Sequence, residues 1–333
     1  MYFAIVCSSV SSLCHRPIPA AGGRSCVLLL SRRTAPSEID IVAKVLAVPD
    51  VGQDGNMLSI PEVTLNDGHR FAELGLGTYG LRAEEGIESV TAAIDSGYRL
   101  LDTALNYENE SEVGEGIRRS SVDRDELIVT TKLPGRDHGY HETIASAQAS
   151  LAALGLDRID VYLIHWPNPR VNKYVDTWKA MIHLRDEGVL RSIGVSNFTV
   201  GMLERLADET GVVPAVNQVE LHPYFPQAEL RAYHAAHGIR TESWSPLAKR
   251  SELLNESIVQ ELAEVHRVTP SQIVLRWHVE LASTPIPKSA DPDRQRENAD
   301  VFGFSLDAED VAAVSALERG RLWGGDPETH EEF

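Results

Sequence analysis

The sequence has few cysteines and no long hydrophobic run. Its three cysteines, Cys7, Cys14 and Cys26, all lie near the N-terminus, and their spacings match neither a zinc site nor a C-x-x-C motif. A body without cysteine is not built on a disulfide framework, so we expect a reducing, cytoplasmic setting. Nowhere do about 18 apolar residues follow one another, as a membrane-spanning helix requires. We therefore expect no membrane segment.

Basic residues are also in short supply. The 333 residues include 31 Lys and Arg against 49 Asp and Glu, a formal net charge of −18. A chain this acidic repels the phosphate backbone, so nucleic acid is not an expected partner. A small anionic cofactor is less strongly excluded, because it needs only a locally basic pocket. No metal site is expected either, since HETIA at 141–145 lacks the second histidine of the H-E-x-x-H zinc motif.

Residues 1–56 differ in character from the rest of the chain. Ser, Cys and Pro cluster there without a sustained period, and no basic stretch precedes the first apolar one, as a signal peptide would require. Three interpretations stay open: a non-functional or mis-started extension, a targeting segment, or a structural part. We expect residues 1–56 to be a disordered extension and residues 57–333 to form the folded domain.

From Met57 onward, strand-like and helix-like segments alternate. The turn Asn66-Asp67-Gly68 separates two short strand-like arms and predicts a β-hairpin. Strands that alternate with helices favour a parallel sheet, and eight such units favour a closed (β/α)8 TIM barrel whose bottom the hairpin closes. An open doubly wound sheet is the alternative. The eight expected strands span 74–79, 99–104, 127–133, 159–167, 191–198, 215–223, 240–246 and 283–289.

Gly75, Gly77 and Gly80 spell G-x-G-x-x-G, the dinucleotide fingerprint of the doubly wound fold. In that fold a diphosphate lies at the N-terminus of the helix that follows. Here the following helix carries Glu84 and Glu85 in its first turn, and their carboxylates would repel a diphosphate. We therefore interpret the glycines as a tight turn after the first barrel strand.

Four polar residues fall at or just after the C-terminal ends of three consecutive expected strands, where a barrel keeps its chemistry. Asp102 and Tyr107 belong to the second strand and its loop, Lys132 to the third, and His165 to the fourth. A lysine cation lowers the pKa of a nearby tyrosine from its ordinary value of about 10, and an aspartate holds the lysine in place. A histidine can orient a carbonyl oxygen. Each residue alone could be structural, but together they indicate a proton donor.

Three longer stretches contain these residues and others, in order: GYRLLDTALNYENESEVGEGI, LGLDRIDVYLIHWP and IPKSADPDRQRENADVF. They resemble the three signature regions of the aldo-keto reductases, and the resemblance extends from about Met57 to the C-terminus. The body most resembles the bacterial 2,5-diketogluconate reductase-like branch. The resemblance implies that Tyr107, Lys132, Asp102 and His165 are a catalytic tetrad and that NADPH binds without a doubly wound domain.

The same resemblance implies the cofactor and substrate contacts. The substrate is expected to be a small-molecule carbonyl compound, bound by His165, Tyr79 and Trp166. Carried over by motif, the contacts with the nicotinamide end of the cofactor are Ser196, Asn197 and Gln218 at the carboxamide and Trp244 on the ring, and those with the pyrophosphate are Ser245 and Leu247. In the IPKS motif, Ile286 is a further cofactor contact, and Lys288, Ser289 and the later Arg294 are expected to meet the 2′-phosphate. Glu297 and Asn298 are expected near the adenine.

The implied reaction is hydride transfer from NADPH to an aldehyde, ketoaldehyde or diketone, with Tyr107 as proton donor in a monomeric enzyme. Two alternatives stay open. One is a catalytically weak NADP(H)-binding barrel with a regulatory or structural role, and the other is a doubly wound dehydrogenase that uses the glycine fingerprint. The stretch RLWGGDPETHEEF, residues 321–333, is expected to fold over the barrel mouth.

Overall fold

The computed structural model describes residues 26–31, 42–47, 58–323 and 325–333. Contacts divide the chain into two units, residues 1–56 and 57–333, which are described separately. In the first unit, β1 (Cys26–Ser31) pairs antiparallel with β2 (Val42–Ala47). The rest of that unit, and with it most of the expected disordered extension, lies outside the described residues.

The second unit is built on an eight-stranded parallel sheet whose strand order follows the chain from β5 to β12. A doubly wound sheet would instead reverse its order at a switch point. The sheet curls until its ends meet, where Gly75 N–H donates to Pro285 O and Gly77 N–H to Pro287 O, each at 3.1 Å. The predicted barrel is thereby confirmed. Its strands are β5 (Leu76–Gly77), β6 (Leu100–Asp102), β7 (Ile128–Leu133), β8 (Ile159–Ile164), β9 (Leu190–Ser196), β10 (Val216–Glu220), β11 (Arg240–Trp244) and β12 (Ser283–Pro285).

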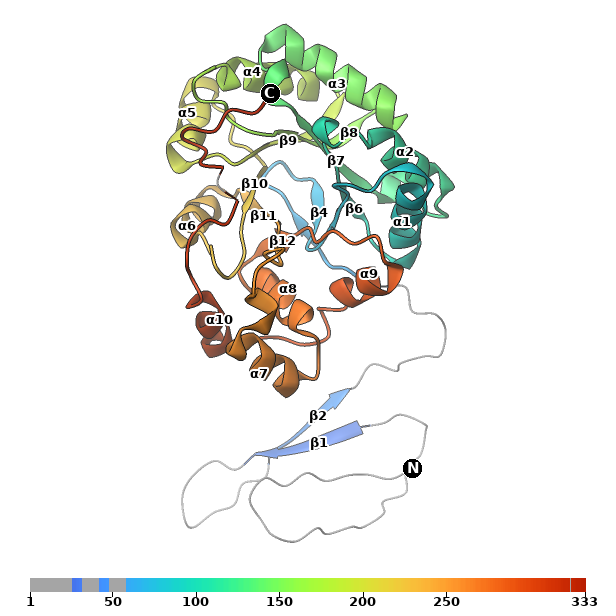
Figure 1. Cartoon of the computed structure of the whole chain (residues 1–333), viewed down its shortest axis with the longest axis vertical. Coiled ribbons are helices and arrows are strands. Elements are labelled where there is room, and N and C mark those ends of the chain that lie inside the picture. Colours follow the sequence, from blue (N-terminus) through green and yellow to red (C-terminus); the bar gives the residue numbers. More distant parts are fainter. Residues whose placement is uncertain (1–25, 32–41, 48–57, 324) are drawn as a thin grey trace. The chain divides into compact units, whose positions relative to one another are not determined.

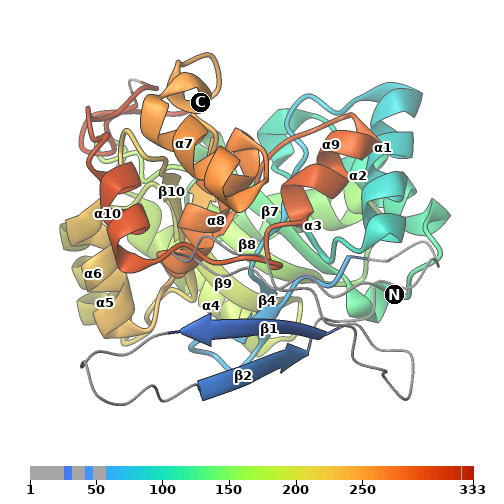
Figure 2. The same cartoon turned by 90° about the horizontal axis from the view of Figure 1, so that it is seen from below.

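Helices surround the strands in both views of this unit (Figures 1 and 2). They follow the strands along the chain, as the alternating pattern predicts. The α-helices are α1 (Ala83–Ser96), α2 (Glu110–Arg119), α3 (Tyr140–Leu154), α4 (Tyr174–Asp186), α5 (Val200–Thr210), α6 (Ala228–His237), α7 (Ser257–His266), α8 (Pro270–Glu280), α9 (Pro292–Ala299) and α10 (Ala308–Ser315). Single 3₁₀ turns are η1 (Leu105–Tyr107), η2 (Arg124–Glu126), η3 (Gly135–Asp137) and η4 (Leu253–Asn255).

The predicted hairpin closes the N-terminal end of the barrel. Its strands β3 (Glu62–Thr64) and β4 (Arg70–Ala72) pair antiparallel. Phe71 is fully buried in one cluster with side chains of β6, β8 and β10. Asn66, at the turn, donates from Nδ2 to Pro214 O at 3.0 Å, just before β10 begins. Because the hairpin covers this end of the barrel, a functional site is expected at the opposite end, where the strands have their C-termini.

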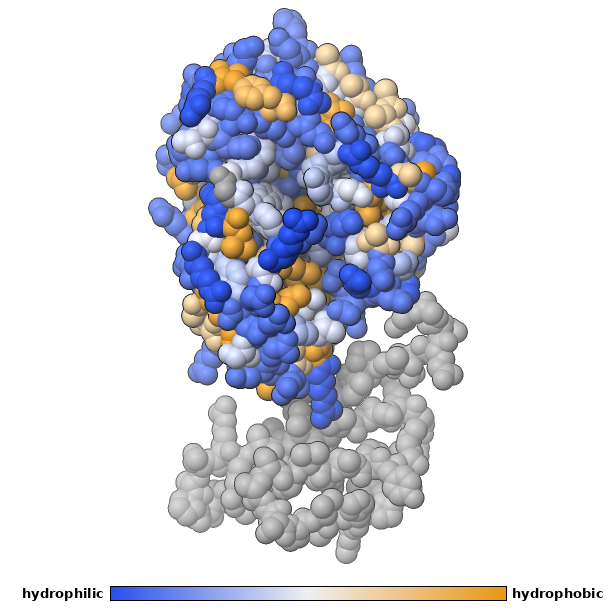
Figure 3. Space-filling view, viewed as in Figure 1, coloured by the Kyte–Doolittle hydropathy of each residue, from blue (hydrophilic) through white to orange (hydrophobic). Residues whose placement is uncertain are grey.

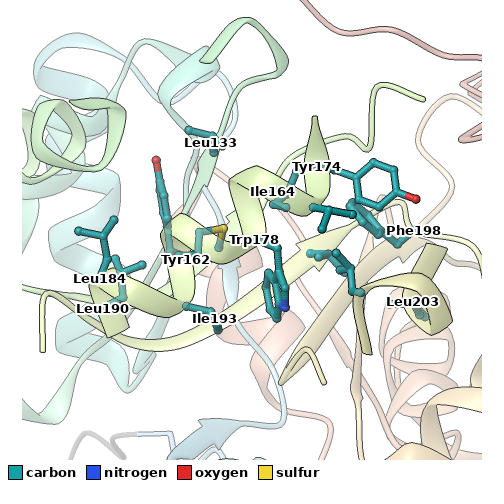
Figure 4. Close-up of a cluster of buried hydrophobic side chains, with 14 of the residues drawn as sticks. Leu133, Tyr162, Ile164, Tyr174, Trp178, Leu184, Leu190, Ile193, Phe198 and Leu203 are labelled. Carbon is teal, nitrogen blue, oxygen red and sulfur yellow. The ribbon is translucent and has the colours of Figure 1, made fainter. Parts of the chain in front are cut away.

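The largest core cluster lies between the sheet and its outer helices. Figure 4 shows Trp178 of α4 packed among side chains that include Tyr162 and Ile193, with Phe198 nearby, and all four are buried. Burying aromatic side chains of this size supplies much of the hydrophobic stabilisation of a domain. The face of this unit that Figure 3 shows is mostly hydrophilic, with some hydrophobic residues near its centre. Among the described residues, no helix has the length and apolar character to cross a membrane.

The glycine fingerprint lies on the seam where β5 meets β12. A Cβ atom on Gly77 would lie 2.8 Å from Ile286 O, and one on Gly75 would lie 2.8 Å from Leu100 Cδ2. Gly80 has a φ of 75°, in the left-handed region that glycine adopts without strain. Gly80 therefore makes the predicted turn, whereas Gly75 and Gly77 let two strands approach and close the barrel.

We expect Gly77→Ala to lower the free energy of unfolding by about 1–3 kcal/mol, because its Cβ meets a backbone carbonyl that cannot move without parting the seam. The matched control is Gly201→Ala in α5, where an added Cβ has no atom within 4 Å. That change should be neutral or stabilise by up to about 1 kcal/mol through helix propensity. Urea unfolding followed by circular dichroism measures both, and equal effects would contradict the role of the seam.

Candidate active site

The four residues expected to act together meet at the C-terminal end of the strands. Lys132 of β7 donates from Nζ to Asp102 Oδ1 at 2.6 Å, to Asp102 Oδ2 at 2.8 Å and to Thr103 O at 2.8 Å. Tyr107, in the turn η1 after β6, places its hydroxyl 3.5 Å from the same Nζ. The His165 ring follows β8 and lies edge-on to the Tyr107 ring, with 5.9 Å between centroids. The tetrad predicted from the strand ends is therefore one cluster.

The Lys132 ammonium group is buried with its counter-ion. Lys132 is 0% exposed and Asp102 is 1% exposed. A buried ion pair survives only when its hydrogen bonds are complete, and Lys132 has both carboxylate oxygens and a carbonyl as acceptors. Burial lowers the pKa of Lys132, but the charges of Asp102 and Tyr107 outweigh it and raise the pKa to about 12. Lys132 is therefore a cation at neutral pH.

The pKa of Tyr107 is raised, whereas the sequence analysis expected Lys132 to lower it. Burial raises this pKa above its ordinary value, the Lys132 charge lowers it, and Asp102 raises it again, so the sum is upward. The lysine acts in the predicted direction, but burial, which the sequence does not show, is larger. The phenol of Tyr107 consequently holds its proton at neutral pH, with the Lys132 ammonium beside it.

A second buried carboxyl group, Glu242 on β11, adjoins the tetrad. Gln218 donates from Nε2 to Asp102 Oδ2 at 2.8 Å and to Glu242 Oε2 at 2.7 Å, so its amide joins the two carboxyl groups. Glu242 is fully buried, and burial followed by the charge of Asp102 raises its pKa. The sequence analysis did not predict this residue. The available signal was an acidic side chain in the middle of a short predicted strand.

Three residues expected at the nicotinamide form one linked group beside the tetrad. Asn197 donates from Nδ2 to His165 O and to Ser196 Oγ, each at 3.0 Å. Trp244 donates from Nε1 to Asn197 Oδ1 at 2.9 Å. Asn197 has a φ of 63°, which turns the chain sharply after β9. The structure thus brings these residues together next to His165.

The residues expected near the adenosine lie farther along, between β12 and α9. Lys288 is exposed, and the Arg294 side chain is 75% exposed with Nε 3.9 Å from Asp291 Oδ2. Ser289 is buried and donates to Asp291 O at 3.1 Å. Lys288 therefore lies on the connection between β12 and α9 and Arg294 in the first turn of α9, and both side chains are exposed. The other expected cofactor residues are the buried Ile286 and Asn298 and the partly buried Ser245, Leu247 and Glu297.

The two predicted aromatic walls stand at the mouth. Tyr79 is 66% exposed, and its ring lies edge-on to that of Tyr107 with 5.1 Å between centroids. The Trp166 ring lies 4.2 Å from that of His330. His330 belongs to the C-terminal stretch, so Trp166 contacts the segment that the sequence analysis expected to fold over the mouth.

That C-terminal stretch also brings a carboxylate to the tetrad. Glu332 Oε1 lies 2.8 Å from His165 Nδ1 and accepts a hydrogen bond from Asn106 Nδ2 at 2.7 Å. Burial raises the pKa of Glu332, but hydrogen bonding and the His165 charge outweigh it, and the pKa falls below its ordinary value. The expected fold of this stretch is confirmed. The contact between Glu332 and His165 had no signal in the sequence.

A model of the aldo/keto reductase family matches residues 73–319. The chain belongs to this family. It is 70% identical over 277 residues to 2,5-diketo-D-gluconic acid reductase B of Corynebacterium sp. (strain SHS752001), a match that covers 83% of this chain and 100% of the relative. It is 44% identical over 268 residues to methylglyoxal reductase DkgA of Escherichia coli (strain K12). That match covers 80% of this chain and 96% of the relative.

Solved structures agree with this family assignment. A crystal structure of an aspartate-to-alanine mutant of Gox0644 in complex with NADPH is 44% identical with a TM-score of 0.78, covering 82% of this chain and 99% of that one. A Bombyx mori aldo-keto reductase in complex with NADP is 35% identical with a TM-score of 0.74. That match covers 78% of this chain and 94% of the Bombyx mori chain. The family and the oxidoreductase class expected from the motifs are thereby confirmed for this aldo/keto reductase.

The raised pKa of Glu242 predicts a pH-dependent stability. The pKa of Glu242 in the folded protein lies above its value of about 4.3 in the unfolded chain. The stability that Glu242 contributes is therefore complete below about pH 4.3 and is lost as the pH rises through the folded pKa. Gln cannot ionise, so we expect Glu242→Gln to gain stability relative to the wild type between pH 5 and pH 9. Urea unfolding at pH 5, 7 and 9 measures the difference, with pH 5 as internal control. A difference that does not change with pH would contradict the prediction.

Proposed function

We propose that this protein reduces the carbonyl group of aldehydes, ketoaldehydes or diketones to an alcohol with NADPH. One observation carries the proposal: the Tyr107 hydroxyl lies 3.5 Å from the ammonium of Lys132, which is itself buried and paired with Asp102 at the barrel mouth. This is the arrangement of a tyrosine that gives up a proton and is then stabilised as phenolate. The substrates named for the relatives, a diketo sugar acid and methylglyoxal, belong to this class.

The residues of this chain carry out the proton transfer that accompanies the addition of hydride. NADPH, when bound, supplies the hydride that adds to the carbonyl carbon. As the carbonyl oxygen gains negative charge, Tyr107 transfers its hydroxyl proton to that oxygen, and Lys132 stabilises the phenolate left behind. Asp102 holds Lys132 at its place through two hydrogen bonds. His165 orients the carbonyl oxygen toward Tyr107.

The donor set beside the tetrad fits the cofactor. Ser196, Asn197 and Gln218 present hydroxyl and amide groups of the kind that bind a carboxamide, and Trp244 presents a partly buried ring. The exposed cations Lys288, before α9, and Arg294, in its first turn, are of the kind that binds a 2′-phosphate in an otherwise acidic chain. The NADPH and NADP complexes of related proteins support the same choice. A monomeric, cytoplasmic enzyme stays a prediction.

We expect Tyr107→Phe to bind NADPH as the wild type does and to lose turnover by about 10²–10⁴-fold, because only the proton donor is removed. NADPH fluorescence titration measures binding, and NADPH consumption with methylglyoxal measures turnover. Tyr140→Phe, at the start of α3 and away from the tetrad, is the matched control. If wild type and Tyr107→Phe both bind NADPH and neither reduces any of a broad panel of carbonyl compounds, a cofactor-binding regulatory or structural barrel is the better account.

We expect Arg294→Ala to raise the Kd for NADPH about tenfold and to leave the weaker binding of NADH unchanged, because only NADPH carries the 2′-phosphate. Arg296→Ala is the matched control, since this side chain lies on the same helix and pairs with Asp293. Fluorescence titration with both cofactors measures the ratio of the two Kd values. Equal losses of NADPH and NADH affinity would contradict a phosphate contact.

A further inference from the structure

The C-terminal segment, residues 321–333, is fastened at its base and near its tip. At the base, Leu322 N–H donates to Glu220 Oε1 at 2.7 Å. Near the tip, Asn168 donates from Nδ2 to Glu332 O at 2.7 Å, and Glu332 N–H donates to Asn168 Oδ1 at 3.0 Å. Figure 1 shows this part of the chain running from α10 to the end marked C. The described residues of the segment are therefore held at two places, beside the end of β10 and beside the loop after β8.

The Glu332 carboxylate is bound by groups from three different loops. Asn106, after β6, donates from Nδ2 to Oε1 at 2.7 Å. Gly135, after β7, donates its backbone N–H to Oε2 at 3.0 Å. His165, after β8, places Nδ1 2.8 Å from Oε1. Arg136 donates to Asn106 Oδ1 and so fixes which way the Asn106 amide points.

The loop after β7 is shaped to admit this group. A Cβ atom on Gly135 would lie 2.2 Å from Asn168 Nδ2 and 2.2 Å from Glu332 O, so a side chain at position 135 would push the segment away. The Glu332 side chain is only 13% exposed, which means that its charge is largely withdrawn from water. A carboxylate held this closely next to the tetrad occupies a built site.

We propose that Asn106, Gly135 and His165 form a binding site for a carboxylate carried by the substrate, and that Glu332 occupies this site until such a substrate displaces it. The proposal rests on the proposed function. It states where the carboxylate of an oxo acid, the kind of substrate for which one relative is named, binds a few bonds from the reducible carbonyl. Exchange of one carboxylate for another preserves the hydrogen bonds. Glu332 acts as an intramolecular competitor that lowers the apparent affinity for these substrates.

Succinate binding tests the site without any reaction. Because Trp166 contacts His330 and Trp323 belongs to the segment, tryptophan fluorescence reports displacement of the segment, and Trp166→Phe should weaken the signal. We expect Glu332→Gln to bind succinate at least about fivefold tighter than the wild type and Asn106→Ala to bind it at least about fivefold more weakly. Glu331→Gln is the matched control, since Glu331 accepts from Arg170 N–H instead. Unchanged succinate affinity in Glu332→Gln would overturn the proposal.

Kinetics with succinic semialdehyde and its methyl ester separate charge from bulk. Glu332→Gln should lower the KM for the semialdehyde and leave the KM for the neutral ester nearly unchanged. Equal changes for both substrates would mean that Glu332 merely obstructs the mouth, which overturns the proposal. If the wild type reduces neither compound with NADPH while Glu332→Gln still tightens succinate binding, the proposed function fails and the carboxylate site stands.

Discussion

The buried ion pair between Lys132 and Asp102 is the interaction on which the site depends. Withdrawing two charges from water costs several kcal/mol per ion, and the cost is recovered only if their geometry is held closely. The barrel supplies that geometry, because β6 and β7 are adjacent hydrogen-bonded strands in which Asp102 lies opposite Thr130. Tyr107 then follows within one turn of β6. A lysine fixed in this way can act on the tyrosine without rearranging.

The same ion pair explains the protonation of its neighbours. Asp102 and Lys132 neutralise each other, so an ionised Glu242 would leave an uncompensated charge in the closed interior. The raised pKa of Glu242 removes that charge by keeping a proton on the group, and Gln218 bridges the two carboxyl groups with its amide. Burial likewise keeps on Tyr107 the proton that the proposed reaction uses.

The sequence predicts the barrel and the tetrad because both depend on local order along the chain. Alternating segments identify the eight strands, and a barrel places every strand end at one rim, so Asp102, Lys132 and His165 had to converge. Glu242 was not predictable in this way, since its contact with Gln218 and Asp102 depends on how far the sheet curls. The path of Glu332 depends on contacts with three separate loops. No local pattern encodes either arrangement.

The glycine fingerprint shows what such a motif encodes and what it does not. In a doubly wound fold, glycines let a backbone approach a pyrophosphate. Here Gly77 lets β5 approach the carbonyl of Ile286, and the seam of the barrel closes on that contact. In both folds the glycine backbone lies so close to its partner that a Cβ atom would not fit. Whether the approaching partner is a ligand or another strand is decided by the helix that follows, whose Glu84 and Glu85 disfavour a phosphate, and by the strand order of the sheet.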